Sequence, residues 1–367
     1  MAGTMQLEQA AGESGWQLEI LEDPARQGKR LDSVAEFMDF LRCGKHSDGE
    51  MYILTEGISK LKLETSLPET LHQACLTKQS TVEALLNTLD RGDPWAGELF
   101  WWPPGETKRE EVCGVDLCNK LLRYRPFAET CYVAEMRRSK RALHGQSLEM
   151  TDTLTLTDVK DLASFQLPFW DRGHGFLGSA GAGICLHVDQ AWWSNVAKNF
   201  FGNKLVALWG PGTRVLDTCG GELFRKPLCE RHLAALAECR RVALLRPGDV
   251  ACFTGGLPHT TLVLGSALNL TFYESFLNWN CDNLDLLLSG LQRRVDQAWW
   301  QNNMEPKFVE TVLGDIVRVA GDFIEDSEDH EKFVSLLRTR PLTAARLVQA
   351  GIQERLRPGT AKRRCLR

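Results

Sequence analysis

The N-terminal part of the chain carries hydrophobic residues at the spacing of amphipathic helices. Residues 79–90 show this spacing and end at the turn signal 91–94, which is typical of a helix terminus. A short apolar piece, Met51–Leu54, has the length and composition of a strand instead. Residues 31–43 predict another helix, whose apolar face consists of Leu31, Val34, Phe37, Met38 and Leu41.

Between residues 152 and 270 the pattern changes to short apolar runs separated by glycine-rich punctuation. The punctuation includes a predicted turn at Asp171–Gly175. Many short strands at this spacing favour a β-sandwich or a barrel. The apolar runs are Leu205–Trp209, Val242–Leu245, Val250–Phe253 and Leu268–Tyr273.

From residue 282 onward the apolar residues recur at helical spacing again. We therefore expect an α+β protein with a mainly β core and helical flanks on both sides. The pattern divides the chain into a flexible N-terminus (1–15), a mixed α/β flank (16–150), a β core (151–280), a C-terminal helical region (281–357) and a basic tail (358–367).

The composition is that of an ordinary globular protein, with 43% hydrophobic and 25% charged residues. The 43 Lys and Arg against 48 Asp and Glu give a net charge of −5, which provides no electrostatic footprint for nucleic acid. The 12 cysteines include no CxxC pair, so we expect reduced thiols and a cytoplasmic or nuclear protein. No secretory signal and no run of about 18 apolar residues is found, so we expect no membrane partner.

The candidate chemistry begins at His187-Val188-Asp189. In a strand, residues i and i+2 point to one face, so the imidazole and the carboxylate would lie together. They would supply two ligands of a 2-His-1-carboxylate triad, which leaves open positions on Fe(II). His259 is the candidate for the second histidine, because the turn Pro247–Asp249 precedes a strand and Gly255-Gly256 permits a sharp bend before it. A single histidine in a strand is more often a core residue than a ligand, so the case rests on the combination.

Lys204 is the candidate anion-binding residue. It shares strand parity with Val206 and Leu208, which places it on a buried face, where an ammonium group is costly unless it meets an anion. A dicarboxylate co-substrate would supply that anion. Two alternatives remain: Lys204 could reach water from the strand's open end, or Lys198, in a loop-like segment, could bind the anion instead.

These segments together resemble the JmjC family, the cupin-fold Fe(II)- and 2-oxoglutarate-dependent oxygenases. The likeness is close over residues 160–276 and looser over 31–150. It implies a double-stranded β-helix, the cupin or jelly-roll fold, for the core, and it is closest to the small protein-hydroxylase members. The similar segments are the glycine-rich approach and HxD (177–189), the lysine strand (202–211), the PGD-to-histidine segment (247–259) and the last core strand (267–273).

The resemblance implies roles for individual residues. His187, Asp189 and His259 would bind Fe(II), and Lys204 would pair with the distal carboxylate of 2-oxoglutarate. On the last core strand, one or more of Asn269, Thr271 and Tyr273 would contact the co-substrate. The chain departs from the family at Ile184, where many members have Thr or Ser, and at Gly210-Pro211, where they have a proline pair. Tyr132 or Thr155 could supply the missing hydroxyl.

The residues directly after the HxD motif are candidates for the mouth of the pocket. They are Gln190, Trp192, Trp193, Ser194 and Asn195, although ordinary packing would also account for the two tryptophans. The resemblance implies an oxygenase that uses O2 to hydroxylate a side chain of a protein or peptide. It also suggests a homodimer formed through the C-terminal helices, by analogy of fold.

Several other functions remain open at this stage. Histone or protein lysine demethylation has less support, because no zinc-finger or reader module accompanies the core. A cupin binding protein without catalysis is favoured by Ile184 but not by the intact set of three ligands and Lys204. A zinc-bound scaffold and an RNA-modifying enzyme are further alternatives.

Overall fold

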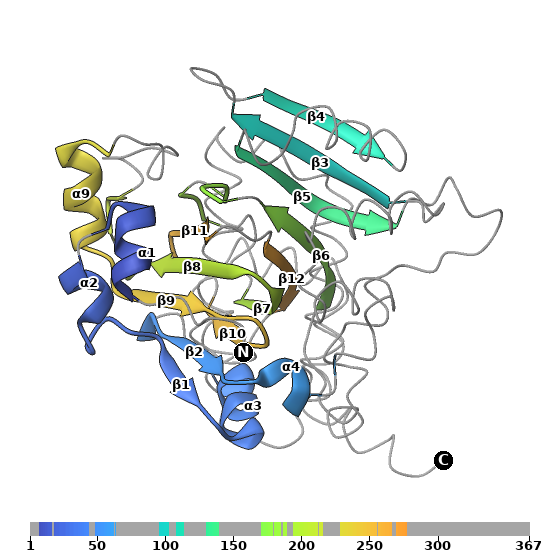
Figure 1. Cartoon of the computed structure of the whole chain (residues 1–367). Coiled ribbons are helices and arrows are strands. Elements are labelled where there is room, and N and C mark those ends of the chain that lie inside the picture. The colour runs from blue at the N-terminus through green and yellow to red at the C-terminus, as the bar shows by residue number, and fades with distance from the viewer. Residues whose placement is uncertain are drawn as a thin grey trace, which may run out of the picture.

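The protein is mainly β, with a few helices, in a computed structural model (Figure 1). The described residues form two sheets with a shared interior, an arrangement compatible with a β-sandwich. These residues are 7–16, 18–43, 48–61, 63, 95–102, 108–113, 130–138, 170–178, 180–184, 186–188, 194–211, 213–215, 228–254, 256–265 and 269–276.

The larger sheet has nine strands in the order β1-β2-β10-β7-β12-β6-β5-β3-β4. Strands from the predicted flank, β1 to β5, therefore extend the same sheet as strands from the predicted core. Their bounds are β1 Lys29–Leu31, β2 Met51–Leu54, β3 Trp95–Trp102, β4 Lys108–Cys113, β5 Thr130–Arg138, β6 Trp170–Gly178, β7 Ser194–Phe201, β10 Val250–Phe253 and β12 Asn269–Phe276.

The smaller sheet consists of β8 (Asn203–Leu208) between β9 (Arg241–Leu245) and β11 (His259–Leu264). Both pairings are antiparallel, and Lys204 stands opposite Leu245 on one side and Val263 on the other. Every residue of β11 is buried, and so is every residue of β8 except Asn203. A strand that is covered on both faces has a nearly continuous apolar sequence, and this is why the apolar runs predicted strands of this sheet.

The interior between the two sheets is filled by alternate residues of the facing strands. The smaller sheet contributes Val206, Leu208, Ala243 and Leu245, and the larger sheet contributes Met51, Ile53, Ala197, Ala251 and Phe253. Because side chains alternate along a strand, the residues between these positions point outward. Lys204 has the parity of Val206, so it faces the interior.

Helices cover the outer face of the smaller sheet (Figure 1). They are α1 (Leu7–Ser14), α2 (Leu18–Glu22) and α9 (Glu230–Ala237), and they pack on Leu205, Ala207 and Leu244. The indole of Trp209 donates a hydrogen bond to the carbonyl oxygen of Ala235 at 2.9 Å, which fixes α9. The remaining helices are α3 (Val34–Cys43) and α4 (Gly57–Lys60). None of the helices described is long and apolar enough to cross a membrane.

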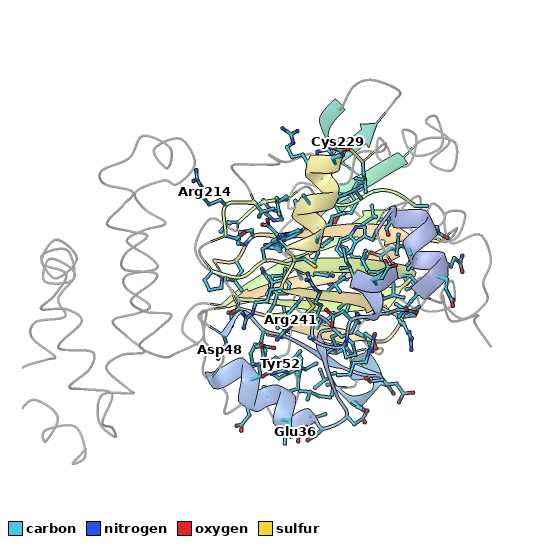
Figure 2. The ribbon with its side chains drawn as sticks, turned by 90° about the vertical axis from the view of Figure 1, so that its left-hand side faces the viewer. Glu36, Asp48, Tyr52, Arg214, Cys229 and Arg241 are labelled. Carbon is cyan, nitrogen blue, oxygen red and sulfur yellow. The ribbon has the colours of Figure 1, made fainter. Side chains whose placement is uncertain are left out.

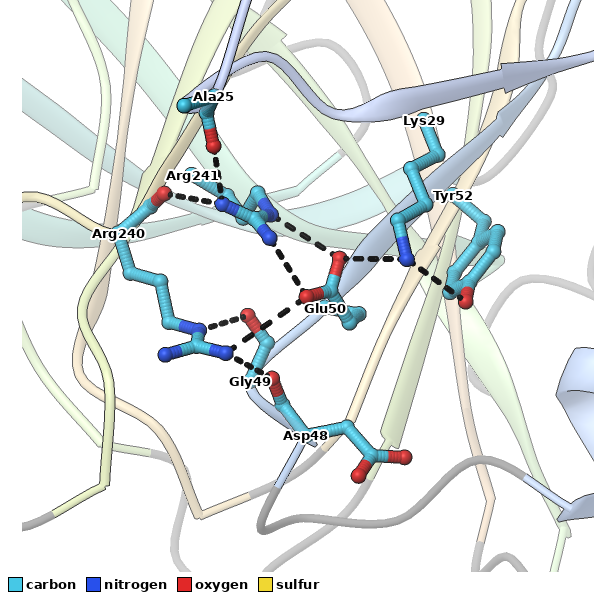
Figure 3. Close-up of polar contacts among 8 residues, drawn as sticks. All are labelled: Ala25, Lys29, Asp48, Gly49, Glu50, Tyr52, Arg240 and Arg241. Carbon is cyan, nitrogen blue, oxygen red and sulfur yellow. Dashed lines mark hydrogen bonds and ion pairs between the residues drawn. The ribbon is translucent and has the colours of Figure 1, made fainter.

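A network of ion pairs joins the N-terminal segment to the smaller sheet (Figure 3). The guanidinium of Arg241 donates to both carboxylate oxygens of Glu50, at 3.0 and 2.6 Å. Lys29 lies 3.3 Å from the same carboxylate, and Arg240 donates to the backbone oxygens of Asp48 and Gly49. Burial works to raise the pKa of Glu50, but hydrogen bonds and charges from Arg241 and Lys29 outweigh it and lower that pKa.

The strands predicted at 51–54, 205–209, 242–245 and 250–253 are confirmed, and 268–273 corresponds to β12. The turn predicted at 171–175 is wrong, because these residues form part of β6, where β12 supplies hydrogen-bond partners despite the glycines. The helix predicted from 31 begins at Val34, since Leu31 pairs with Leu54 in the sheet.

Three other predictions concern the ends of the chain and residues 79–90. Residues 7–14, assigned to a flexible N-terminus, form α1 with Ala10 fully buried. The helix predicted at 79–90 and the C-terminal region 281–357 lie outside the described residues.

Three cysteines have described side chains, and all three are free thiols. Burial raises the pKa of Cys239 to about 11 and that of Cys252 well above its ordinary value, so both are poor nucleophiles. Cys229 is exposed at the N-terminal end of α9 (Figure 2), where the backbone N–H of His232 lowers its pKa. The expectation of reduced thiols along the whole chain stays a prediction.

Candidate functional site

The structure brings His187 and His259 together across a single antiparallel bridge. Each residue donates its backbone N–H to the other's carbonyl oxygen, at 3.0 and 2.9 Å. Directly opposed residues in an antiparallel pair have their side chains on the same face. The two imidazole rings accordingly lie with centroids 4.2 Å apart, at an interplanar angle of 54°. The pairing inferred from the sequence is therefore present in the fold.

The glycine-rich segment before His187 accounts for this pairing, because it runs beside β11. Gly181 donates to the carbonyl oxygen of Val263, and Thr261 donates to that of Ile184. Two residues separate Ile184 from His187, whereas one separates Thr261 from His259. The segment thus carries one extra residue, as in a β-bulge, a device that re-aims side chains near functional sites.

Gly183 is required by the closeness of this approach. A Cβ atom at this position would lie 1.8 Å from the carbonyl oxygen of Thr261. Backbone atoms cannot move aside as a flexible side chain can, so a glycine is the residue that fits. In the glycine-rich segment before the HxD motif, Gly183 therefore allows two stretches of backbone to come into direct contact.

His259 is buried and its ring is held in one orientation. Its Nδ1 lies 3.0 Å from the carbonyl oxygen of Leu257, and the ring of Phe253 packs at a centroid distance of 4.9 Å. A carbonyl oxygen can only accept, so Nδ1 donates and the neutral ring keeps its lone pair on Nε2. Gly256, with φ at 72°, makes the bend that the sequence predicted before this histidine.

The third predicted ligand, Asp189, lies outside the described residues, as do Gln190, Trp192 and Trp193. Among the residues that are described, no group of three metal-ligating side chains comes together. The donor set seen is thus a pair of imidazoles, delivered by two segments that are far apart in the sequence.

Lys204 is completely buried, as its strand parity predicted. Three aromatic rings surround its side-chain nitrogen, and we call these rings the aromatic cage: Tyr132, Phe176 and Tyr273, with centroids at 5.6, 5.7 and 4.9 Å from Nζ. Nζ also donates to the hydroxyl of Tyr132 at 3.3 Å. Burial lowers the pKa of Lys204 to about 7. No carboxylate of the described residues pairs with it.

Ile184 packs against this same cage. It is partly buried against the cluster of Tyr132, Phe176 and Ala182, on which Tyr273 also packs. Of the two residues suggested to replace the missing hydroxyl, Tyr132 reaches Lys204, whereas Thr155 lies outside the described residues. A glycine is also needed at position 178, because a Cβ atom there would lie 2.8 Å from the ring of Tyr132 and 2.8 Å from the side chain of Val263.

Asn269 and Thr271 form a buried polar cluster with Asn199 of β7. The amide of Asn269 donates to Oδ1 of Asn199 at 2.6 Å, and the hydroxyl of Thr271 lies 2.9 Å from the same oxygen. Asn199 in turn donates to the carbonyl oxygen of Gly202 at 2.9 Å. Of the three residues that the sequence proposed on this strand, Tyr273 is the one beside Lys204.

Asn195 lies at the start of β7, on the inward parity of Ala197. It stands opposite Phe253 of β10 and Ser275 of β12, and it is buried. Because Phe253 packs on His259, this places Asn195 near the histidine pair. Its neighbour Ser194 is also buried.

The assignment of Lys198 to a solvated loop is wrong. Lys198 lies within β7, is buried, and forms an ion pair with the buried carboxylate of Glu274 on β12. Its parity is opposite to that of Asn199, so it points away from the interior that holds Lys204. Lys198 is therefore not the anion-binding residue of this site.

Phe176 of the aromatic cage and Asn199 of the buried polar cluster were missed from the sequence. Phe176 lies in β6, opposite Thr271 of β12, and it directly follows the residues whose glycines had suggested a turn. Asn199 follows a lysine in a run that looked polar and loop-like. The sequence signal that could have found Asn199 is the period-two spacing of Asn195, Ala197 and Asn199, which is that of a strand with these three residues on one face.

No family model matches the chain, and no curated protein matches it.

Proposed function

We propose that the protein is an Fe(II)- and 2-oxoglutarate-dependent oxygenase built on a double-stranded β-helix of the JmjC type. The observation that carries the proposal is the contact between His187 and His259, whose rings are 4.2 Å apart. It is supported by Lys204, which faces the same interior without a carboxylate partner among the described residues.

The residues present fit a ferrous ion. Two neutral imidazoles are ordinary ligands for Fe(II), and HxD would add a carboxylate from Asp189 to complete a facial triad. Because Nδ1 of His259 bonds to the carbonyl oxygen of Leu257, Nε2 is the ring nitrogen that would bind the metal, which is the usual outer-shell arrangement of a ligating histidine. When bound, the iron would supply the activation of O2 that drives the oxidation.

The chain's own residues hold and orient the co-substrate. Lys204 would pair with the distal carboxylate of 2-oxoglutarate, and the Tyr132 hydroxyl would donate a second hydrogen bond to it. The rings of Phe176 and Tyr273 exclude water around this charge pair, which strengthens it. Ile184 contributes only apolar contact.

The substrate we favour is a side chain of a protein or peptide, which would be hydroxylated. Gln190, Trp192, Trp193 and Asn195 would line the mouth of the pocket, and the buried position of Asn195 next to Phe253 supports a role close to the metal. We place the protein in the cytoplasm or the nucleus, as a homodimer through the C-terminal region.

The test is conversion of 2-oxoglutarate to succinate with Fe(II), on protein purified without oxygen. We expect slow turnover that His187→Ala and Lys204→Ala abolish. The control is Lys60→Ala, which removes a lysine paired with the exposed Asp32 far from the interior, and which should keep full turnover. Absence of turnover together with absence of metal-dependent 2-oxoglutarate binding would reject the proposal.

A cupin binding protein without catalysis is the second candidate. The observation in its favour is Ile184, which gives the anion pocket an apolar wall where a hydroxyl would be useful. It predicts no consumption of 2-oxoglutarate, so the turnover assay separates the two candidates.

A further inference from the structure

We infer that, above neutral pH, the co-substrate site takes up a proton from solvent when a dicarboxylate binds: Lys204 is then mainly a neutral amine in the empty site and an ammonium ion in the occupied one. The inference rests on the proposed function, because it concerns the same site. It adds that binding is linked to pH and that the charge pair forms only on binding.

The first argument is the burial of Lys204 in apolar surroundings. The side chain is completely buried, and its nitrogen faces three aromatic rings and one phenolic hydroxyl. Ring faces favour a cation by only a modest amount. Removal of an ammonium group from water costs several times more, so the cage alone does not keep the proton on.

The second argument is the charge on every element packed around Lys204. On the strands beside it, Leu245 of β9 and Val263 of β11 are apolar. Facing it, β5 presents Tyr132, β6 presents Phe176 and β12 presents Tyr273. Within the described part of the chain, the titratable groups facing its nitrogen are therefore the two tyrosines, and no carboxylate is among them.

Lys198 provides an internal comparison. It is also a buried lysine on a central strand, but it forms an ion pair with Glu274. The fold thus supplies a counter-ion to the buried lysine that points away from the interior. The lysine that points into the interior, Lys204, has no counter-ion among the described residues, and the pKa of about 7 given by its burial agrees with that difference.

The direction of the pH effect follows from linkage. A bound carboxylate favours the ammonium form, so the pKa of Lys204 is higher in the complex than in the empty site. Below pH 7 the proton is already present, and binding takes up little. Above pH 7 each binding event must recruit a proton, so the affinity falls by about tenfold between pH 6 and pH 8.

The experiment is titration calorimetry of 2-oxoglutarate into the full chain loaded with Mn(II), which keeps oxygen chemistry out of the measurement. At pH 8 the same titration is run in phosphate and in Tris, because a heat that depends on the buffer's ionisation enthalpy counts the protons taken up. We expect nearly one proton at pH 8 and almost none at pH 6.

The matched ligand is 2-oxovalerate, which keeps the metal-chelating 2-oxo acid but has a methyl group in place of the distal carboxylate. It should bind without taking up a proton, which separates Lys204 from the histidines at the metal. Lys204→Arg, whose guanidinium stays charged, should bind 2-oxoglutarate with no proton uptake.

The outcomes distinguish the inference from the proposed function. Binding of 2-oxoglutarate with the same affinity at pH 6 and pH 8 and no proton uptake overturns the inference and leaves the co-substrate site intact. Equal proton uptake with 2-oxovalerate also overturns it. Failure of 2-oxoglutarate to bind at either pH overturns the proposed function itself.

Discussion

Gly183 and Thr261 touch through their backbones so closely that a methyl group on Gly183 would lie 1.8 Å from the Thr261 carbonyl oxygen. This contact holds the segment before His187 against the strand that starts with His259. The spacing of the two rings therefore depends on a residue that has no functional group.

The first prediction is that Gly183→Ala separates the histidine pair. The added methyl group must push the segment away from β11, which weakens the hydrogen bonds of Ile184 and Thr261. We expect a loss of stability of about 2–4 kcal/mol in urea unfolding and at least a tenfold weaker Mn(II) affinity. The matched control is Gly12→Ala in α1, where a Cβ meets nothing within 4 Å and should stabilise by about 0.5–1 kcal/mol.

The second prediction concerns Ile184 and the co-substrate. Ile184→Thr should place a hydroxyl beside the aromatic cage and tighten 2-oxoglutarate binding by about tenfold, the value of one hydrogen bond to a charged group. Ile184→Val keeps the branched shape without the hydroxyl and should give no gain. Equal affinities in the two variants would show that the side chain at 184 does not face the carboxylate.

The third prediction separates Thr271 from Tyr273. The Thr271 hydroxyl is occupied by Asn199, so Thr271→Val should reduce stability by about 1 kcal/mol and leave the Kd for 2-oxoglutarate unchanged. Tyr273→Leu removes the ring nearest to Lys204 and should weaken binding several-fold. Calorimetry and urea unfolding of both variants provide the comparison.

The fourth prediction concerns the ion pairs of Glu50 (Figure 3). Its pKa is lowered in the folded protein, so its contribution to stability is present above its unfolded pKa, near 4.5, and is lost as the pH falls through the folded value. Glu50→Gln should cost about 1–2 kcal/mol at pH 7 and less at a pH below 4.5, with the cost shrinking as the pH falls. Glu36→Gln, on the exposed face of α3 (Figure 2), should change stability little at either pH.

Strand parity was enough to predict part of the site. It placed Lys204 inward, because the apolar neighbours on β8 make its burial on that face unavoidable. The turn before β10 and the bend before His259 were also readable, since Gly248 and Gly256 have the positive φ angles that such sites require.

The rest of the site could not be predicted from the sequence, because it depends on pairing between strands that are far apart in the chain. Residues 171–175 look like a turn and become a strand only because β12 lies beside them. Lys198 looks solvated and is buried only because Glu274 faces it across the sheet. Local propensity carries no information about such partners, because they lie far away in sequence; Lys198 and Glu274, for example, are 76 residues apart.

The order of strands in the larger sheet also has a consequence for how the chain folds. Strand β2 pairs with β10, so Met51 must find Phe253, its partner across nearly the whole described chain. Contacts of such high sequence separation slow folding. During synthesis, β1 and β2 emerge long before the strand that they join, with Met51, Ile53 and Leu54 exposed until β10 is complete. We expect the newly made N-terminal segment to depend on chaperones, and protein truncated before residue 250 to aggregate rather than form a stable half-sheet.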